Sequence, residues 1–186
     1  GTISCVISGE FNLYKTFSGT ITLSGANTYT GTTTVSGGTL QAGVATVLNT
    51  DGSQQSGAFG VNSAVTVSSG TLALNGFSNT IGSLAGGAAV TLGTSASAML
   101  TIGTNNTNTT FSGALTGSGG VVKVGTGSLT FNSDKRYTGG TTVNTGTLVL
   151  NDVYDDGLGV LVGALNVNSA GTVQLTGGAS SLGWST

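Results

Sequence analysis

The acidic residues are the side chains of this sequence best suited to chemistry. The chain has six carboxylates, at Glu10, Asp51, Asp134, Asp152, Asp155 and Asp156. Only the last three lie close together, in the segment "NDVYDDG" (151–157). This cluster suggests either a calcium site or a catalytic pair of carboxylates. The alternative interpretation is a solvated acidic loop between two strands.

The rest of the sequence gives these chemistries little support. There is no histidine, which excludes histidine-based triads and imidazole ligands for zinc. Calcium prefers six or more oxygen ligands, and the Gly-Gly-x-Gly-x-Asp repeats of calcium-binding β-rolls are absent. A polysaccharide lyase also needs a placed cation, and Lys135 and Arg136 stand apart from the acidic segment. We therefore predict no catalytic residue, no metal and no cofactor, with a degraded polysaccharide enzyme as a distant alternative.

Aromatic and hydroxyl side chains form a second group with chemical potential, this time for binding. Tyr29 and Tyr137 are suited either to stacking on sugar rings or to packing at equivalent corners of the fold. The alternating Thr28, Thr30, Thr32 and Thr34 resemble the flat threonine arrays of ice-binding solenoids, although Arg136, Thr138, Gly140 and Thr142 occupy the same places around Tyr137. The candidates for a glycan- or ice-binding surface are therefore Tyr29, Tyr137, Thr30, Thr32 and Thr34.

The low charge of the chain excludes several partners. Charged residues make up 5% of it and the net charge is −2, whereas a nucleic-acid face needs several phosphate contacts from Lys and Arg. No apolar run approaches the ~20 residues of a membrane helix, so this segment is not expected to insert into a membrane.

The single cysteine, Cys5, is interpreted either as a small buried hydrophobe or as a residue that pairs with another chain.

Composition and periodicity predict an all-β fold. The chain has 34 Gly and no Pro, few strong helix formers, and many Thr and Val residues, which suit a pleated surface. Short alternations of apolar and polar residues occur at 20–23, 32–35, 39–42, 64–67 and 71–74. Thr33 shares the inward parity of Val35, so its hydroxyl should need a buried partner. The predicted inward residues are Ile21, Leu23, Val35, Leu40, Val65, Val67, Leu72 and Leu74.

The sequence also repeats itself at a fixed distance. "LSGANTYTGTTTVSGGTLQA", from Leu23, corresponds to "FNSDKRYTGGTTVNTGTLVL", from Phe131. The offset is 108 residues, and it also relates Lys15 to Lys123 and Tyr29 to Tyr137. Residues 1–108 therefore form one copy and residues 109–186 a second, incomplete copy within a single domain of 1–186.

Short strands, frequent turns and this long repeat predict a parallel β-solenoid. In such a coil each turn lays its strands on those of the turn below, about 4.8 Å away, so that like residues stack in columns. With roughly 20 residues per turn, one copy would hold about five turns. The rival fold is an antiparallel sandwich, which the poor hairpin signals disfavour.

The blocks Tyr-Thr-Gly, Thr-Thr-Val and Gly-Thr-Leu occur twice in fixed order, and this pattern resembles the autotransporter-associated β-strand repeat. It is carried by "LYKTFSGTITLSGANTYTGTTTVSGGTLQAG" (13–43), "VVKVGTGSLTF" (121–131) and "YTGGTTVNTGTLVL" (137–150). The resemblance implies a right-handed parallel β-helix, export to the bacterial cell surface, and a role as stalk, spacer or adhesive surface. It implies no enzymatic residue.

Departures from the pattern and the ends of the chain raise the question of partners. Cys5 replaces a usual Gly, and Glu10, Phe11, Tyr14 and 134–136 place bulk and charge on turns, where a site or subunit contact is expected. Neither end reads as a capping repeat, and the chain starts at Gly1, so we expect either a slice of a longer passenger or subunits that stack end to end. The candidates for end-to-end contact are Ile3, Cys5, Ile7, Leu182 and Trp184.

The sequence thus predicts a non-enzymatic, extracellular structural or adhesive β-solenoid of the autotransporter-passenger type. It would act as a cell-surface stalk or as a filament-forming subunit in a head-to-tail homopolymer. The alternative is a glycan- or ice-binding surface module with a polysaccharide or other cell-surface target.

Overall fold

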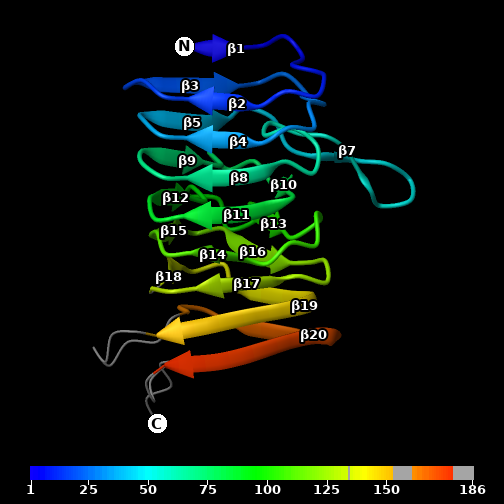
Figure 1. Cartoon of the computed structure of the whole chain (residues 1–186), viewed down its shortest axis with the longest axis vertical. Helices are drawn as coiled ribbons and strands as arrows, with labels where there is room; N and C mark the ends of the chain where they lie inside the picture. Colours follow the sequence, from blue (N-terminus) through cyan, green and yellow to red (C-terminus); the bar gives the residue numbers. More distant parts are fainter. Residues whose placement is uncertain (134, 153–160, 178–186) are drawn as a thin grey trace.

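The computed structural model describes residues 1–133, 135–152 and 161–177, which form strands and connecting turns without a helix. Nearly all the named strands pair in parallel, and they stack along one axis (Figure 1). In Figure 1 the brighter strands in front run leftward and the fainter strands behind run rightward as the chain descends. The chain is therefore a right-handed parallel β-solenoid, which confirms the predicted fold.

Each complete turn presents three sides, which we call faces A, B and C. Face A is the seven-stranded sheet, and the eleven-stranded sheet bends to give faces B and C. Face A contains β1 (Thr2–Ile3), β3 (Thr20–Leu23), β5 (Thr39–Ala42), β9 (Thr71–Ala73), β12 (Ala89–Thr91), β15 (Leu115–Gly117) and β18 (Lys135–Tyr137). Face B contains β2 (Leu13–Lys15), β4 (Thr33–Val35), β8 (Ala64–Val67), β11 (Ser83–Gly86), β14 (Thr109–Phe111) and β17 (Ser128–Phe131). Face C contains β10 (Asn79–Ile81), β13 (Met99–Ile102) and β16 (Gly120–Lys123).

Two long strands complete both face B and face C. The first half of β19 (Thr141–Asp152) pairs with β16, and its second half pairs with β17. Between the halves, the pairing of β19 with β20 (Leu165–Gly177) shifts register between Val143 and Thr145. These strands therefore turn the corner from face C to face B without leaving the ladder.

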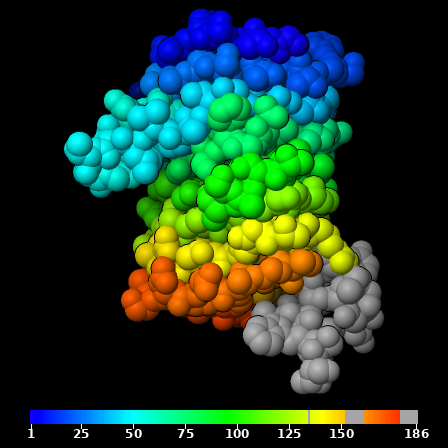
Figure 2. All heavy atoms as spheres, turned by 180° about the vertical axis from the view of Figure 1, so that it is seen from behind, coloured from blue at the N-terminus to red at the C-terminus, as the bar shows by residue number. Residues whose placement is uncertain are grey.

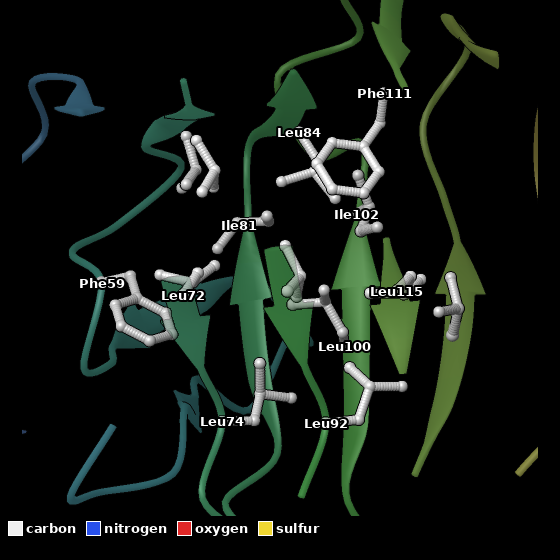
Figure 3. Close-up of a cluster of buried hydrophobic side chains, with 14 of the residues drawn as sticks. Phe59, Leu72, Leu74, Ile81, Leu84, Leu92, Leu100, Ile102, Phe111 and Leu115 are labelled. Carbon is white, nitrogen blue, oxygen red and sulfur yellow. The ribbon is translucent and has the colours of Figure 1, made fainter. Parts of the chain in front are cut away.

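The core consists of columns of aliphatic side chains that run along the axis. On face A, Leu40 pairs with Leu72, Leu72 with Val90, and Val90 with Leu115. Figure 3 shows Leu72 and Leu115 among buried side chains contributed by the other faces. The thin interior is filled by one or two such residues from each strand, which explains why small and medium aliphatics suffice.

The predicted strands and their inward residues are confirmed. All five segments form strands with bounds within one residue of the prediction. Seven of the eight predicted inward residues are buried, and Ile21 is partly buried against the same core. Thr33 is fully buried, as its parity required.

The two sequence repeats lie on different faces of the coil. Lys15 belongs to β2 on face B, whereas its counterpart Lys123 belongs to β16 on face C. Likewise, β4 lies on face B, and the matching first half of β19 lies on face C. The offset of 108 residues is therefore not a whole number of turns, and it rotates the repeated segment by one face.

Candidate functional site

The lysine of each repeat closes a corner of the coil. The Lys15 ammonium donates to the carbonyl oxygens of Phe17 and of Gly37, the latter at 2.9 Å. The Lys123 ammonium donates to Val124 (2.6 Å), Gly125 (3.0 Å) and Thr145 (3.3 Å). Both side chains are buried, and desolvation lowers the pKa of Lys123. The cation thus binds backbone carbonyls at the corner of the coil, where the carbonyl groups need a donor.

A glycine stands beside each lysine, for a steric reason. Gly38 and Gly146 are equivalent under the 108-residue offset and have φ of +59° and +70°. A Cβ at Gly38 would lie 2.2 Å from the Gly19 oxygen, and one at Gly146 would lie 2.2 Å from the Gly125 oxygen. Only glycine fits where the corner backbone passes the turn above so closely.

The tyrosine of each repeat closes a second corner, from inside. The Tyr29 hydroxyl hydrogen-bonds to Thr33 Oγ1 at 2.7 Å, and the Tyr137 hydroxyl hydrogen-bonds to Thr141 Oγ1. Both rings are fully buried. Burial raises the pKa of Tyr29 to about 12 and raises the pKa of Tyr137 further, while the threonine hydrogen bonds act in the opposite direction. Thr33 and Thr141 therefore have the hydroxyl partner that an inward threonine needs.

The residue two positions before each tyrosine differs between the repeats. Asn27 is buried, accepts a hydrogen bond from the Ile7 amide (2.9 Å) and donates to the Ala58 carbonyl (2.8 Å). Its counterpart Lys135 is also buried, and its ammonium lies 5.5 Å from the Phe111 ring centroid and 5.0 Å from that of Phe131. The expectation that Lys135 sits on an exposed turn is wrong, because it continues the inward column below Leu115 in β18.

The predicted surface-binding tyrosines do not reach the surface. Because Tyr29 and Tyr137 are buried, neither ring can stack on a sugar, and the packing alternative is confirmed. Thr30 and Thr32 are exposed and Thr34 is half-buried. Since the matching segment of the second repeat lies on another face, these threonines do not extend into one flat array along the coil.

The residues predicted for end-to-end contact are only partly described. Ile3 and Ile7 are partly buried against the core. Cys5 is exposed, so its interpretation as a small buried hydrophobe is wrong. It lies in the turn beside Gly25, and the Cys5 carbonyl oxygen occupies the space that a side chain at Gly25 would need. Leu182 and Trp184 lie outside the described residues.

The acidic segment gives no described site. Asp152 ends β19, and Asp155 and Asp156 lie outside the described residues. Within the described part of the chain, no three His, Cys, Asp or Glu residues are grouped so as to hold a metal ion. None of the elements described is a helix long and apolar enough to cross a membrane.

A projecting hairpin is a feature that the sequence interpretation missed. Thr39 pairs with Thr71, so this turn takes 32 residues, whereas Thr2 pairs with Thr22 after 20. The extra residues form the antiparallel pair β6 (Val47–Leu48) and β7 (Gln54–Ser56), which stands out from the side of the stack (Figure 2). The signal was present in the long interval between 42 and 64 and in the turn residues "NTDGS" (49–53) at its centre.

These observations define the class of the protein as a parallel β-solenoid whose corners are held by a repeated set of buried Lys, Tyr and Thr residues and by closely packed glycines. Residues 13–42 and 121–150 both match the family model of the passenger-associated-transport-repeat. The chain therefore carries two such repeats, which confirms the resemblance to autotransporter passenger repeats. Neither the curated proteins nor the solved structures include a significant match to the chain. The repeats and the fold fit an autotransporter passenger-type domain, which implies a secreted or cell-surface protein.

Proposed function

We propose that this chain is a rigid, non-catalytic spacer in the exported region of a bacterial surface protein. The observation that carries the proposal is the unbroken stack on face B, where eight strands from β2 to β20 follow one another in parallel register. Seven spacings of about 4.8 Å give the stack a length of roughly 34 Å along its axis. The repeated buried polar groups hold the corners of the coil, so the features shared by the repeats support its shape.

Surface exposure is tested with the native cysteine. Cys5 is exposed and is the only cysteine of this chain. In intact cells of the source organism, a maleimide that cannot cross membranes should label the Cys5 peptide, and a Cys5→Ser variant should lose this label. Labelling that requires cell lysis would contradict the proposal.

Rigidity is tested by a distance measurement along the coil. Spin labels on Cys5 and on a Gln174→Cys substitution in β20 would report from opposite ends of the described stack, and Gln174 is exposed. Electron-spin distance measurements should give one narrow distribution. A broad distribution would show a flexible connection rather than a spacer.

End-to-end self-association and adhesion are finer proposals. The last described strand, β20, leaves Val167 and Leu175 about half exposed, at 48% and 50%. Exposed aliphatic side chains on an outer strand favour pairing with another chain. Analytical ultracentrifugation over a wide concentration range should show growth into linear assemblies that Val167→Asp abolishes, and a monomer at every concentration would contradict this proposal.

A further inference from the structure

The hairpin of β6 and β7 is held rigidly to the coil from which it projects. Ser53 donates to the Asp51 carboxylate from its amide (2.8 Å) and its hydroxyl (2.6 Å), which closes the tip and lowers the pKa of Asp51. Next to the tip, Gln54 Nε2 donates to the carbonyls of Gly60 (2.6 Å) and Thr80 (3.1 Å), and Gln54 Oε1 accepts from the Asn62 amide (2.9 Å). Gln54 thus ties the tip end of β7 to the coil.

Two buried asparagines hold the base of the hairpin from the turns on either side. Asn27 donates to the Ala58 carbonyl (2.8 Å), and Asn79 Oδ1 accepts from the Ala58 amide (3.1 Å). Asn79 also donates to the Val44 carbonyl at 3.1 Å, at the start of the insertion. The returning chain is therefore clamped between neighbouring turns, and the hairpin cannot swing freely over face C.

A groove of about 700 Å³ lies between the hairpin and face C. Leu48 and Gln54 line it from the hairpin side, while Thr80, Thr101 and Val122 line it from successive strands of face C, paired in that order. The groove therefore crosses several turns along the axis of the coil. Its volume falls in the range of roughly 300–1,000 Å³ that is usual for ligand sites.

The groove is neutral and presents hydroxyl groups without protein partners. No Asp, Glu, Lys or Arg is among its described lining residues. The neighbouring Lys123 points to the corner carbonyls instead. Within the described part of the chain, the hydroxyls of Thr80 and Thr101 make no hydrogen bond to protein. Val61, Val122 and Val124 supply apolar surface beside them.

We propose that this groove binds an uncharged oligosaccharide that lies along the coil axis. A charged chain would find no counter-charge in the lining, which excludes uronic-acid polymers and other polyanions as preferred ligands. A sugar chain offers both hydroxyl groups for Thr80 and Thr101 and C–H faces for the valines. An extended peptide fits less well, because β13 and β16 each pair with a neighbouring strand on both sides. No free strand edge is therefore available to hydrogen-bond the peptide backbone.

The test is an NMR titration of the isotopically labelled chain at about 1 mM ligand. The probes are maltohexaose, cellohexaose, laminarihexaose and mannohexaose, with an oligogalacturonate and an alternating Thr-Val hexapeptide for comparison. We expect at least one neutral sugar to shift the amide signals of Thr80, Thr101 and Leu48 selectively. No response to any neutral sugar, or a stronger response to the acidic sugar or to the peptide, would overturn the proposal.

Substitutions on the groove separate specific binding from surface adsorption. Thr80→Val and Thr101→Val each remove one hydrogen-bonding hydroxyl while preserving shape, and each should weaken binding about fivefold. Leu48→Asp places a charge on the hairpin wall at a residue that is 55% exposed, and it should abolish binding. The matched control is Thr66→Val, on face B outside the groove, which should bind normally. Unchanged affinity in the Thr80→Val/Thr101→Val double variant would overturn the assignment.

Discussion

The two passenger repeats give the molecule an internal comparison, because nearly the same segment occurs on two different faces of the coil. Lys15 and Lys123 bind equivalent carbonyls, at Gly37 and Thr145, although one lies on face B and the other on face C. Tyr29 and Tyr137 bind equivalent threonines. The repeat therefore specifies the buried residues of two consecutive corners. The face on which its outward residues lie depends on the lengths of the turns between the two copies.

The differences between the repeats lie in how completely each buried group is partnered. Thr33 contacts a second hydroxyl, Ser63 Oγ at 3.0 Å, in addition to Tyr29. Thr33 pairs with Val65 and Thr141 with Leu165, so the position equivalent to Ser63 is Gly163, and Thr141 lacks this second hydroxyl. Conversely, Lys123 is 1% exposed with three carbonyl partners, whereas Lys15 is 7% exposed with two. The first repeat relies more on its hydroxyl network and the second more on its lysine.

The largest expected effect comes from the corner glycines. Gly38→Ala or Gly146→Ala places a Cβ about 2.2 Å from a carbonyl oxygen in a left-handed backbone conformation. Each should lower the free energy of unfolding by more than about 3 kcal/mol. The control is Gly52→Ala at the hairpin tip, which has φ of +83° but nothing within 4 Å, and which should cost about 1 kcal/mol. Urea unfolding followed by circular dichroism measures all three, and equal losses would show that close approach does not matter.

The buried tyrosines should make the fold sensitive to alkali. Their pKa values are raised in the folded state, so above pH 10 the unfolded chain loses protons that the folded chain keeps, and stability falls as pH rises. For Tyr29, whose pKa is raised from 10.0 to about 12, the loss is about 2 kcal/mol by pH 12. The lowered pKa of Lys123 acts in the opposite direction. Between its folded and its unfolded pKa the unfolded chain holds the extra proton, so its contribution to stability rises with pH in that range.

Phenylalanine substitutions isolate this alkaline effect. The Tyr29→Phe/Tyr137→Phe double variant should have a lower free energy of unfolding at neutral pH but a much flatter decline between pH 10 and pH 12. Urea unfolding at a series of pH values measures both. A decline as steep as that of the natural chain would place the titrating groups elsewhere.

The elements that repeat could be predicted from the sequence, and the elements that interrupt the repeat could not. Alternation fixed the inward side of strands such as β4 and β8, because a period of two leaves no other choice when one side is buried. It also gave Thr33 a buried position and a hydroxyl partner. The same parity applied to Lys135 would have placed it inside, but its charge suggested a turn. Of its two flanking rings, Phe131 precedes it by four residues, whereas Phe111 comes from the turn above.

The candidate groove could not be predicted from the sequence, for a different reason. Its walls come from Leu48, Thr80, Thr101 and Val122, which no motif connects and which meet only once the coil stacks. The face reached by each repeat was also hidden, because it depends on the summed lengths of irregular turns. By contrast, the tyrosines looked like binding residues only because their burial was not yet known.

A smaller effect should separate the two lysines. Lys123→Met leaves three carbonyls without their donor and should lower the free energy of unfolding by about 3 kcal/mol, whereas Lys15→Met should lower it by about 1–2 kcal/mol. Methionine keeps the length of the side chain, so the difference reports hydrogen bonding rather than packing. Urea unfolding of the single and double variants should give additive losses, since the corners are separate. A larger loss for Lys15→Met would reverse the ranking.

The smallest effect tests whether Ser63 supports Thr33 when the tyrosine hydroxyl is removed. Tyr137→Phe should cost about 1–2 kcal/mol, because Thr141 loses its hydroxyl partner, whereas Tyr29→Phe should cost only about 0.5 kcal/mol while Ser63 still reaches Thr33. Adding Ser63→Ala to Tyr29→Phe should remove this protection, and a double-mutant cycle at neutral pH measures the coupling. Equal losses of stability for Tyr29→Phe and Tyr137→Phe, with no coupling to Ser63, would contradict this prediction. Ser63 would then add nothing to the stability of the corner that contains Thr33.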